Sequence, residues 1–174
     1  MALMARRILL RQWSESDLEP YAAMNADAEV MRFFPKPLTR EESALSMTRQ
    51  RAWIEERGWG LWAVEVDGAF AGFTGLAEPK FTAHFTPCIE IAWRLRKESW
   101  GQGIGLAAAQ QAMAYAFGKL KLSELVSFTA VVNLRSRKLM ERLGFSHDPG
   151  EDFDHPQIAE GNWLRRHVLY RKRP

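Results

Sequence analysis

Apolar positions in the first third of the chain predict a strand and two helices. Residues 7–13 have the composition of a first strand, and Ser14 or Ser16 can cap the helix that follows it. A second helix is expected after Thr39, because the sequence Thr-Arg-Glu-Glu is typical of a capping box. Its apolar residues stand among charges until Gly58, where we expect the helix to end.

The middle of the chain has the pattern of a β-hairpin. Residues 61–66 and 69–76 are two apolar runs separated by Asp67-Gly68, a dipeptide that favours the tight turn between antiparallel strands. Residues 89–95 predict a further strand.

A strand–loop–helix–strand succession follows. The strand 89–95 leads into a glycine-rich loop, and then into one apolar helical stripe made of Leu106, Met113, Phe117 and Leu120. The strand 125–132 must lie parallel to 89–95 if the helix makes a right-handed crossover. A short helix closed by Gly144 and a strand around 167–171 complete the pattern. We therefore predict a mixed α/β fold with a predominantly antiparallel sheet, one parallel β-loop-α-β unit and helices on both faces.

Length and composition are consistent with one domain spanning residues 1–174. No uninterrupted apolar run approaches the roughly 18 residues of a membrane span, and residues 1–10 lack a signal-peptide core, so we expect a cytoplasmic protein without membrane contacts. Cys88 is the only cysteine, which excludes an internal disulfide and a site of several thiolates; no metal is expected. The net charge of +3 is compatible with an anionic ligand.

The loop after residue 95 suggests a site for a phosphate-bearing ligand. Gly101, Gly103 and Gly105 remove side chains where backbone N–H groups can converge, and the helix that starts there adds its free amides. A dinucleotide fingerprint does not fit, because Leu106 stands where it needs Gly or Ala. A nucleotide-triphosphate loop does not fit either, because no Gly-Lys-Ser/Thr follows.

Two segments resemble the GNAT family of N-acetyltransferases. The first, Trp100-Gly101-Gln102-Gly103-Ile104-Gly105, is similar to the family's acetyl-CoA loop, with Trp100 in place of the usual Arg or Gln. The second, residues 133–136 with the later Leu-Gly-Phe at 143–145, resembles the branch that contains the N-terminal acetyltransferases of ribosomal proteins. The resemblance implies a GNAT-like fold and an enzyme that transfers an acetyl group from acetyl-CoA directly to a primary amine, either a protein N-terminus or a small amine.

The same resemblance implies which residues bind the co-substrate. Asn133 would hydrogen-bond the pantetheine arm, and Ser136 would lie near the thioester sulfur; Asn133 is equally interpretable as a helix N-cap. The expected acetyl-CoA-binding residues are Trp93, Arg94, Leu95, Trp100, Gly101, Gln102, Gly103, Ile104, Gly105, Leu106, Asn133 and Ser136.

Glu90 and Ser136 are the candidate catalytic residues. Glu90 stands in the apolar strand before the loop and could accept the ammonium proton through water, although strand alternation allows it to face solvent instead. By the same resemblance, Ser136 would support the departing thiolate. Many family members have a tyrosine further along this helix, where this sequence has Met140, so the identity of the acid stays open.

Two other function classes stay open. A noncatalytic acyl-CoA-binding regulatory module would retain the loop without efficient chemistry, and Met140 favours it. A nucleic-acid-binding protein would use the basic residues at 165–173, although charges on a terminal strand usually form a solvated edge. Homodimer formation is left open by the sequence.

Overall fold

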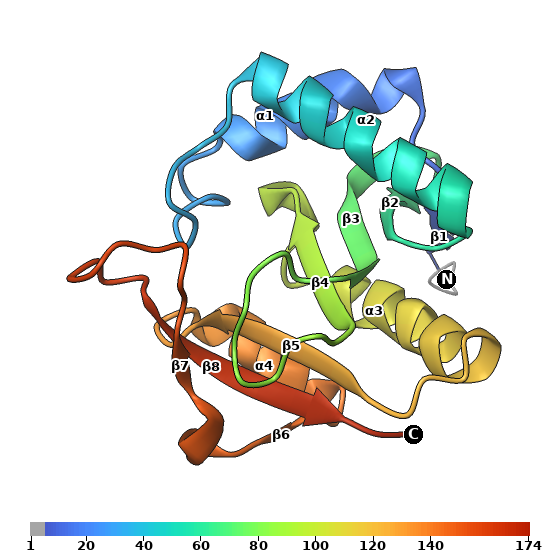
Figure 1. Ribbon diagram of the computed structural model, residues 1–174. Coiled ribbons are helices and arrows are strands. Elements are labelled where there is room, and N and C mark those ends of the chain that lie inside the picture. Colours follow the sequence, from blue (N-terminus) through green and yellow to red (C-terminus); the bar gives the residue numbers. More distant parts are fainter. Residues whose placement is uncertain (1–5) are drawn as a thin grey trace.

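The computed structural model describes residues 6–174, which form one eight-stranded sheet with helices on both of its faces (Figure 1). The strand order is β1-β2-β3-β4-β5-β8-β6, and β7 pairs with β8. The strands are β1 (Ile8–Arg11), β2 (Leu61–Val66), β3 (Ala69–Ala77), β4 (Glu90–Leu95), β5 (Leu125–Ala130), β6 (Ser146–His147), β7 (Phe153–Asp154) and β8 (Arg166–Lys172). The helices are α1 (Leu18–Ala26), α2 (Arg40–Arg57), α3 (Ile104–Ala114) and α4 (Leu134–Arg142).

The helices form two layers. In Figure 1, α1 and α2 lie together above the half of the sheet formed by β1–β4, and α3 and α4 lie on the opposite face. Every pairing except one is antiparallel; β4 and β5 run parallel, with α3 in the crossover between them. The predicted mixed fold is confirmed.

Local signals in the N-terminal half specify their elements well. Asp67 and Gly68 have φ values of 51° and 87° and join β2 to β3, so the predicted hairpin is confirmed. At the start of α2, Thr39 Oγ1 accepts the Glu42 N–H at 3.1 Å, and the Glu42 carboxylate accepts the Thr39 N–H at 2.8 Å. The helix ends at Gly58, which has φ 77°.

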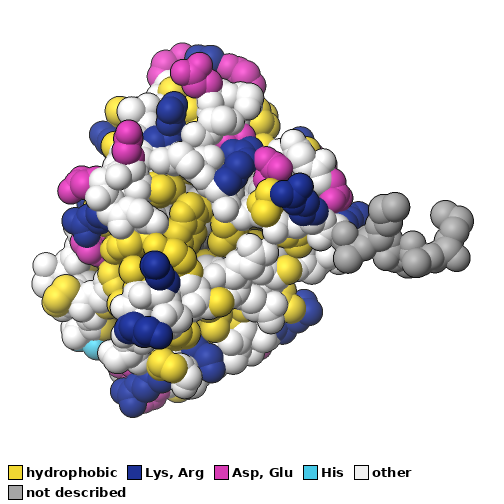
Figure 2. Space-filling model, turned by 90° about the vertical axis from the view of Figure 1, so that its right-hand side faces the viewer, with side chains coloured by type: hydrophobic (Ala, Val, Ile, Leu, Met, Phe, Trp, Pro, Cys, Tyr) yellow, Lys and Arg dark blue, Asp and Glu magenta, His cyan; other side chains and the backbone are white. Residues whose placement is uncertain are grey.

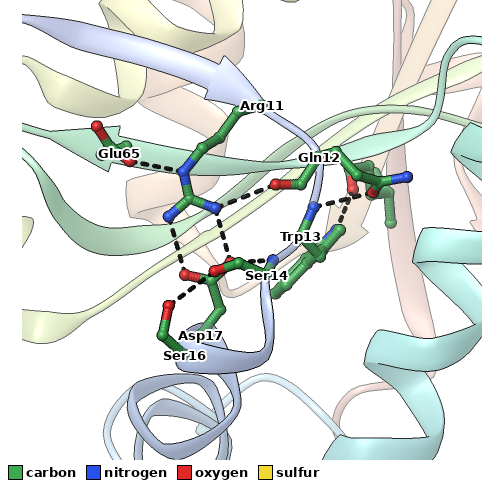
Figure 3. Close-up of polar contacts among 8 residues, drawn as sticks. Arg11, Gln12, Trp13, Ser14, Ser16, Asp17 and Glu65 are labelled. Carbon is green, nitrogen blue, oxygen red and sulfur yellow. Dashed lines mark hydrogen bonds and ion pairs between the residues drawn. The ribbon is translucent and has the colours of Figure 1, made fainter.

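The predicted first strand and helix differ from the observed ones at their junction. β1 ends at Arg11, and a 3₁₀ turn, Glu15–Asp17, precedes α1. A partly buried ion-pair network explains this (Figure 3): Arg11 Nη1 and Nη2 donate to Asp17 at 2.7 and 2.9 Å, and Arg11 Nε donates to Glu65 of β2 at 2.6 Å. The same Asp17 carboxylate accepts the Ser14 N–H at 2.8 Å, which stabilises the tight turn. The network therefore fixes β1, β2 and the start of α1 together.

The face that α3 buries is alanine-rich rather than the stripe we predicted. Its fully buried face, with the turn that follows, consists of Ala108, Ala109, Ala112 and Ala116, whereas Leu106, Met113, Phe117 and Leu120 are partly buried at the border. The small residues let the helix approach the sheet closely. A Cβ on Gly105 would lie 3.3 Å from Leu95 of β4 and 3.4 Å from Leu139 of α4.

The C-terminal elements follow the predicted order. β5 is shorter than the predicted 125–132, because the chain turns after Ala130, whose carbonyl accepts the Asn133 N–H at 2.8 Å. At the end of α4, Gly144 has φ 80° and its N–H donates to the Glu141 carbonyl, while the Phe145 N–H reaches back to the Met140 carbonyl. Within residues 6–174, no helix is both long and apolar enough to cross a bilayer.

Candidate active site

A gap opens in the sheet where β4 and β5 diverge. The two strands pair at one position, Glu90 with Val126, and the Ser127 hydroxyl then donates to the Ile91 carbonyl at 3.0 Å. Backbone groups alternate in direction along a strand. Since the Ile89 carbonyl bonds to β5 and the Arg96 N–H bonds to β3, the backbone groups of the odd-numbered residues in β4 point toward β5. Those of Trp93 and Leu95 therefore face the gap.

The glycine loop stands at the end of this gap, where α3 begins. Gly101 and Gly103 have φ values of 70° and 77°, and a Cβ on either would meet no atom within 4 Å. The first helical hydrogen bond runs from the Ala107 N–H to the Gly103 carbonyl, so the N–H groups of residues 104–106 precede it. A left-handed turn with open space over it, beside free helix amides, fits a pyrophosphate.

Two side chains of the loop, and the space beside one of its glycines, are taken up by contacts within the protein. Ile104 is 3% exposed and packs against Val64, Ala71 and Ala108, so only its backbone is available to a ligand. Gly105 serves the close packing of α3 described above. Gln102 is bound on both sides, by Arg6 and by the Glu98 carbonyl.

Trp100 bridges β4 and α4. Its Nε1 donates to the Leu95 carbonyl at 3.1 Å, and the guanidinium carbon of Arg135 lies 3.6 Å from its ring centre. The indole ring of Trp100 is a flat apolar wall beside the loop, and the Arg135 cation covers one face of it.

The start of α4 completes the rim of the gap. Asn133 Oδ1 accepts the Ser136 N–H at 3.3 Å and Asn133 Nδ2 donates to Thr129 Oγ1 at 2.9 Å, so the N-cap interpretation of Asn133 is confirmed. Ser136 is partly buried next to this cap. Met140 is 1% exposed and belongs to the core, so its side chain offers no group to a ligand.

Glu90 lies at the closed end of the gap, where β4 and β5 still pair. Its side chain keeps some solvent exposure, but burial of the carboxylate raises its pKa to about 8. Burial and the nearby Glu90 charge also raise the pKa of Cys88 to about 11, so this thiol stays protonated at neutral pH. An acid that ionises near pH 8 is suited to exchange protons with an amine.

Arg94, expected from the sequence among the acetyl-CoA-binding residues, has a different side-chain environment in the structure. Its backbone pairs with Phe73 of β3, and its side chain points to the α1/α2 layer, away from the predicted acetyl-CoA site. It lines a cavity of about 190 Å³ with Tyr21, Leu38, Ser46, Gln50, Leu61 and Phe73. A larger cavity, about 270 Å³, lies between β1, β2 and α3, and no residue of β4 lines it. The Arg94 side chain is directed by its contact with Asn25 of α1, which is distant in the sequence, so no local sequence pattern predicts this direction.

The basic residues at 165–173 are partly neutralised by ion pairs. Arg171 contacts Glu124 and Glu151, both at 2.6 Å, and Arg173 shares Glu124. Asp154 pairs with Arg165 and Arg166. On the face drawn in Figure 2, acidic side chains gather at the upper end of the molecule, and Lys and Arg border a hydrophobic hollow below it. The pairing of the terminal strand argues against a nucleic-acid patch there.

Within residues 6–174, no three His, Cys, Asp or Glu side chains come together as a metal site. The loop and the free amides of α3 instead match the chemistry of a phosphate-bearing ligand.

Comparisons with known proteins agree with this geometry. Residues 7–146 match the acetyltransferase (GNAT) domain family. FsC-acetyl coenzyme A-N(2)-transacetylase of Aspergillus fumigatus is 30% identical over 135 residues; the match covers 71% of this chain and 56% of that protein, so this chain spans little more than half of its relative.

Solved structures share the fold over nearly the whole chain. An acetyltransferase from Agrobacterium tumefaciens has a TM-score of 0.76 at 23% identity, covering 99% of this chain and 94% of its own. The ribosomal L7/L12 α-N-protein acetyltransferase RimL, solved with coenzyme A, has a TM-score of 0.76 at 16% identity, covering 95% and 93%. The chain therefore belongs to the GNAT family of acetyltransferases, enzymes that take their acyl group from acetyl-CoA.

Proposed function

We propose that this chain is a single N-acetyltransferase domain that transfers the acetyl group of acetyl-CoA directly to a primary amine, of a protein N-terminus or of a small molecule. One observation carries the proposal: the gap between β4 and β5 has the glycine loop at its open end and Glu90 at its closed end. The loop supplies donors for phosphates, and Glu90 supplies a proton acceptor. Both are needed for this reaction, and they lie along one strand.

The residues divide between holding the donor and moving protons. The N–H groups of residues 101–106, with Trp100 as the wall, would hold the pyrophosphate, and Asn133 would bind the pantetheine arm. Backbone N–H groups of Trp93 and Leu95 would hold and polarise the thioester, because they face the gap. Arg94 contributes only its backbone to β3 at this point, so its side chain is free for another role.

In the reaction, the amine nitrogen forms a bond to the thioester carbonyl carbon and the carbon–sulfur bond breaks. Glu90 accepts a proton from the amine, directly or through one water, and Ser136 supports the thiolate that leaves. No covalent intermediate on the protein is required, in line with the high pKa of Cys88.

A noncatalytic acyl-CoA-binding module is the second candidate, and the burial of Met140 favours it. That residue stands where many family members have a tyrosine that can act as the general acid, and its side chain is packed in the core. Such a module would bind acetyl-CoA as well as an enzyme does but would not release coenzyme A when amines are added.

Calorimetric titration with acetyl-CoA, with NAD and a short RNA as controls, tests donor binding. Release of free coenzyme A with a panel of amines then tests transfer. We expect selective acetyl-CoA binding and amine-dependent release, with kcat/KM about 100-fold lower in Glu90→Gln above pH 8. Acetyl-CoA binding without release of coenzyme A for any amine would support the regulatory module and contradict the enzyme. A folded protein that does not bind acetyl-CoA would contradict both candidate functions.

A further inference from the structure

The Arg94 side chain is enclosed without an acidic partner. Its Nη1 donates to Asn25 Oδ1 of α1 at 2.7 Å, and its guanidinium carbon lies 4.1 Å from the ring centre of Phe34 and 5.3 Å from that of Phe73. Its Nε is fully buried and has no hydrogen-bond partner. Among residues 6–174, no carboxylate lies within 4 Å of the guanidinium.

Two other partly buried arginines of this chain each have carboxylate partners. Arg11 contacts both Asp17 and Glu65, and Arg171 contacts both Glu124 and Glu151. A buried cation is costly unless it is paired. Accordingly, burial lowers the pKa of Arg94, whereas hydrogen-bonded carboxylates raise those of Arg11 and Arg171. Arg94 thus has the stacking that orients a guanidinium but lacks the anion that would compensate it.

The cavity beside Arg94 has donors and apolar walls. Its polar residues are Tyr21, Ser46, Gln50 and Arg94, and its apolar ones are Leu38, Leu61 and Phe73. Arg94 is the only charged residue of this lining. At about 190 Å³ the cavity suits a small organic group rather than a folded segment.

Arg94 and Glu90 are on the same face of β4. Strand alternation places residues 90, 92 and 94 on one side, with the small Ala92 between the two charged residues. Their Cα atoms are about 13 Å apart along the strand, and the two long side chains can close part of this distance. A small molecule over Ala92 could therefore present one end to each.

Building on the proposed N-acetyltransferase activity, we infer that the amine acceptor is a small amino acid-like molecule whose carboxylate binds the Arg94 guanidinium while its amine lies toward Glu90. The Nη hydrogens that Asn25 does not accept provide the fork that a carboxylate binds through two parallel hydrogen bonds, and the partnerless Nε–H lies beside them as a reporter of the site. Arg94 is then the residue that selects acceptors by charge.

Binding is tested by NMR on the protein saturated with coenzyme A. The Arg94 Nε–H signal is assigned by its loss in Arg94→Gln and followed during titration with N-acetylglycine, N-acetyl-β-alanine and N-acetylglutamate, and with their neutral amides. We expect at least one acid to shift the signal in a saturable way and its amide to leave it in place. A signal that no acid in the series moves would overturn the inference.

Kinetics tests the selection independently. For amino acids and their amides as acceptors, we expect the acid-to-amide ratio of kcat/KM to fall about tenfold or more in Arg94→Gln, mainly through KM for the acid. Asn25→Asp should lower the same ratio while the fold is kept, because it gives Arg94 an internal carboxylate. Arg49→Gln, an equal loss of charge at an exposed site on α2, is the matched control and should keep the ratio.

The outcomes separate this inference from the proposed function. An Arg94 signal that responds to acids, with no coenzyme A release for any amine, would contradict acetyl transfer but support the carboxylate site. If amines cause release of coenzyme A but Arg94→Gln leaves the acid-to-amide ratio of kcat/KM unchanged, acetyl transfer is supported and the carboxylate site is contradicted. A preference for peptides with acidic N-terminal residues over every free amino acid would overturn the choice of a small acceptor.

Discussion

The enclosed carboxyl of Glu90 makes the stability of the domain depend on pH. Burial raises its pKa from 4.5 to about 8, so between these values the native protein retains a proton that the unfolded chain has released. The free energy of unfolding therefore falls as the pH rises through this window, and it levels off above pH 8. Glu90→Gln has the shape of the protonated acid and cannot ionise, so it removes this pH dependence.

The size of the effect follows from the pKa. Each pH unit between the two pKa values is worth about 1.4 kcal/mol, which gives roughly 4–5 kcal/mol for a fully enclosed group. Because Glu90 keeps part of its surface in contact with solvent, we expect about half of this, roughly 2–3 kcal/mol. The free energy of unfolding of Glu90→Gln, relative to that of the wild type, should thus be roughly 2–3 kcal/mol higher at pH 9 than at pH 5.

Urea unfolding followed by tryptophan fluorescence measures this gain at the two pH values. Glu56→Gln, at an exposed position of α2, is the control and should show the same difference from wild type at both. If Glu90→Gln also differs from wild type equally at pH 5 and pH 9, Glu90 ionises as an exposed carboxylate does. The reasoning that makes it a proton acceptor near pH 8 would then be refuted.

Three further predictions concern the loop and the network at the start of α1. Gly103→Val should weaken acetyl-CoA binding by calorimetry, because φ 77° disfavours a β-branched residue and the side chain would fill the open space; Gly118→Ala, where a Cβ also meets nothing, should bind normally. Gly105→Leu should lower the free energy of unfolding in urea by about 1–3 kcal/mol, because it overpacks α3 against β4; unchanged stability would contradict the close packing. Burial alone would raise the pKa of Asp17, but Arg11 and the Ser14 N–H hold it below 3.8, so its stabilisation is present above that pH and is lost below it. Asp17→Asn should cost a few kcal/mol at pH 7 and much less near pH 2 in acid-unfolding experiments; equal losses at both would exclude the ion pair as the cause.

The features predicted correctly from sequence are those with local causes. The turn at Asp67-Gly68 and the capping box at Thr39 depend on residues within three positions of each other. The glycine loop is likewise predictable from sequence, because Gly101 and Gly103 adopt positive φ values that other residues rarely adopt. The parallel pairing of β4 and β5 follows from chain handedness.

The features that sequence missed depend on distant partners. Arg94 meets Asn25 across 69 positions, so its direction could not be derived from the strand in which it lies. The alanine face of α3 is buried because the helix lies close to the sheet, a property of the packed layers and not of helical spacing alone. The turn before α1 likewise depends on Glu65, 54 positions after Arg11.

If acetyl-CoA binds in the gap between β4 and β5 as proposed, its supply would also affect the lifetime of the protein. Past Glu90 the two halves of the sheet are joined by packing and one side-chain hydrogen bond rather than by a continuous ladder. A co-substrate lying along the gap would supply bonds to both edges in the native state only, and a ligand present at 100 times its Kd adds about 2.7 kcal/mol to the free energy of unfolding. When acetyl-CoA is scarce, the chain would unfold more often and be degraded faster, so its abundance would follow the acetyl supply without a dedicated regulator.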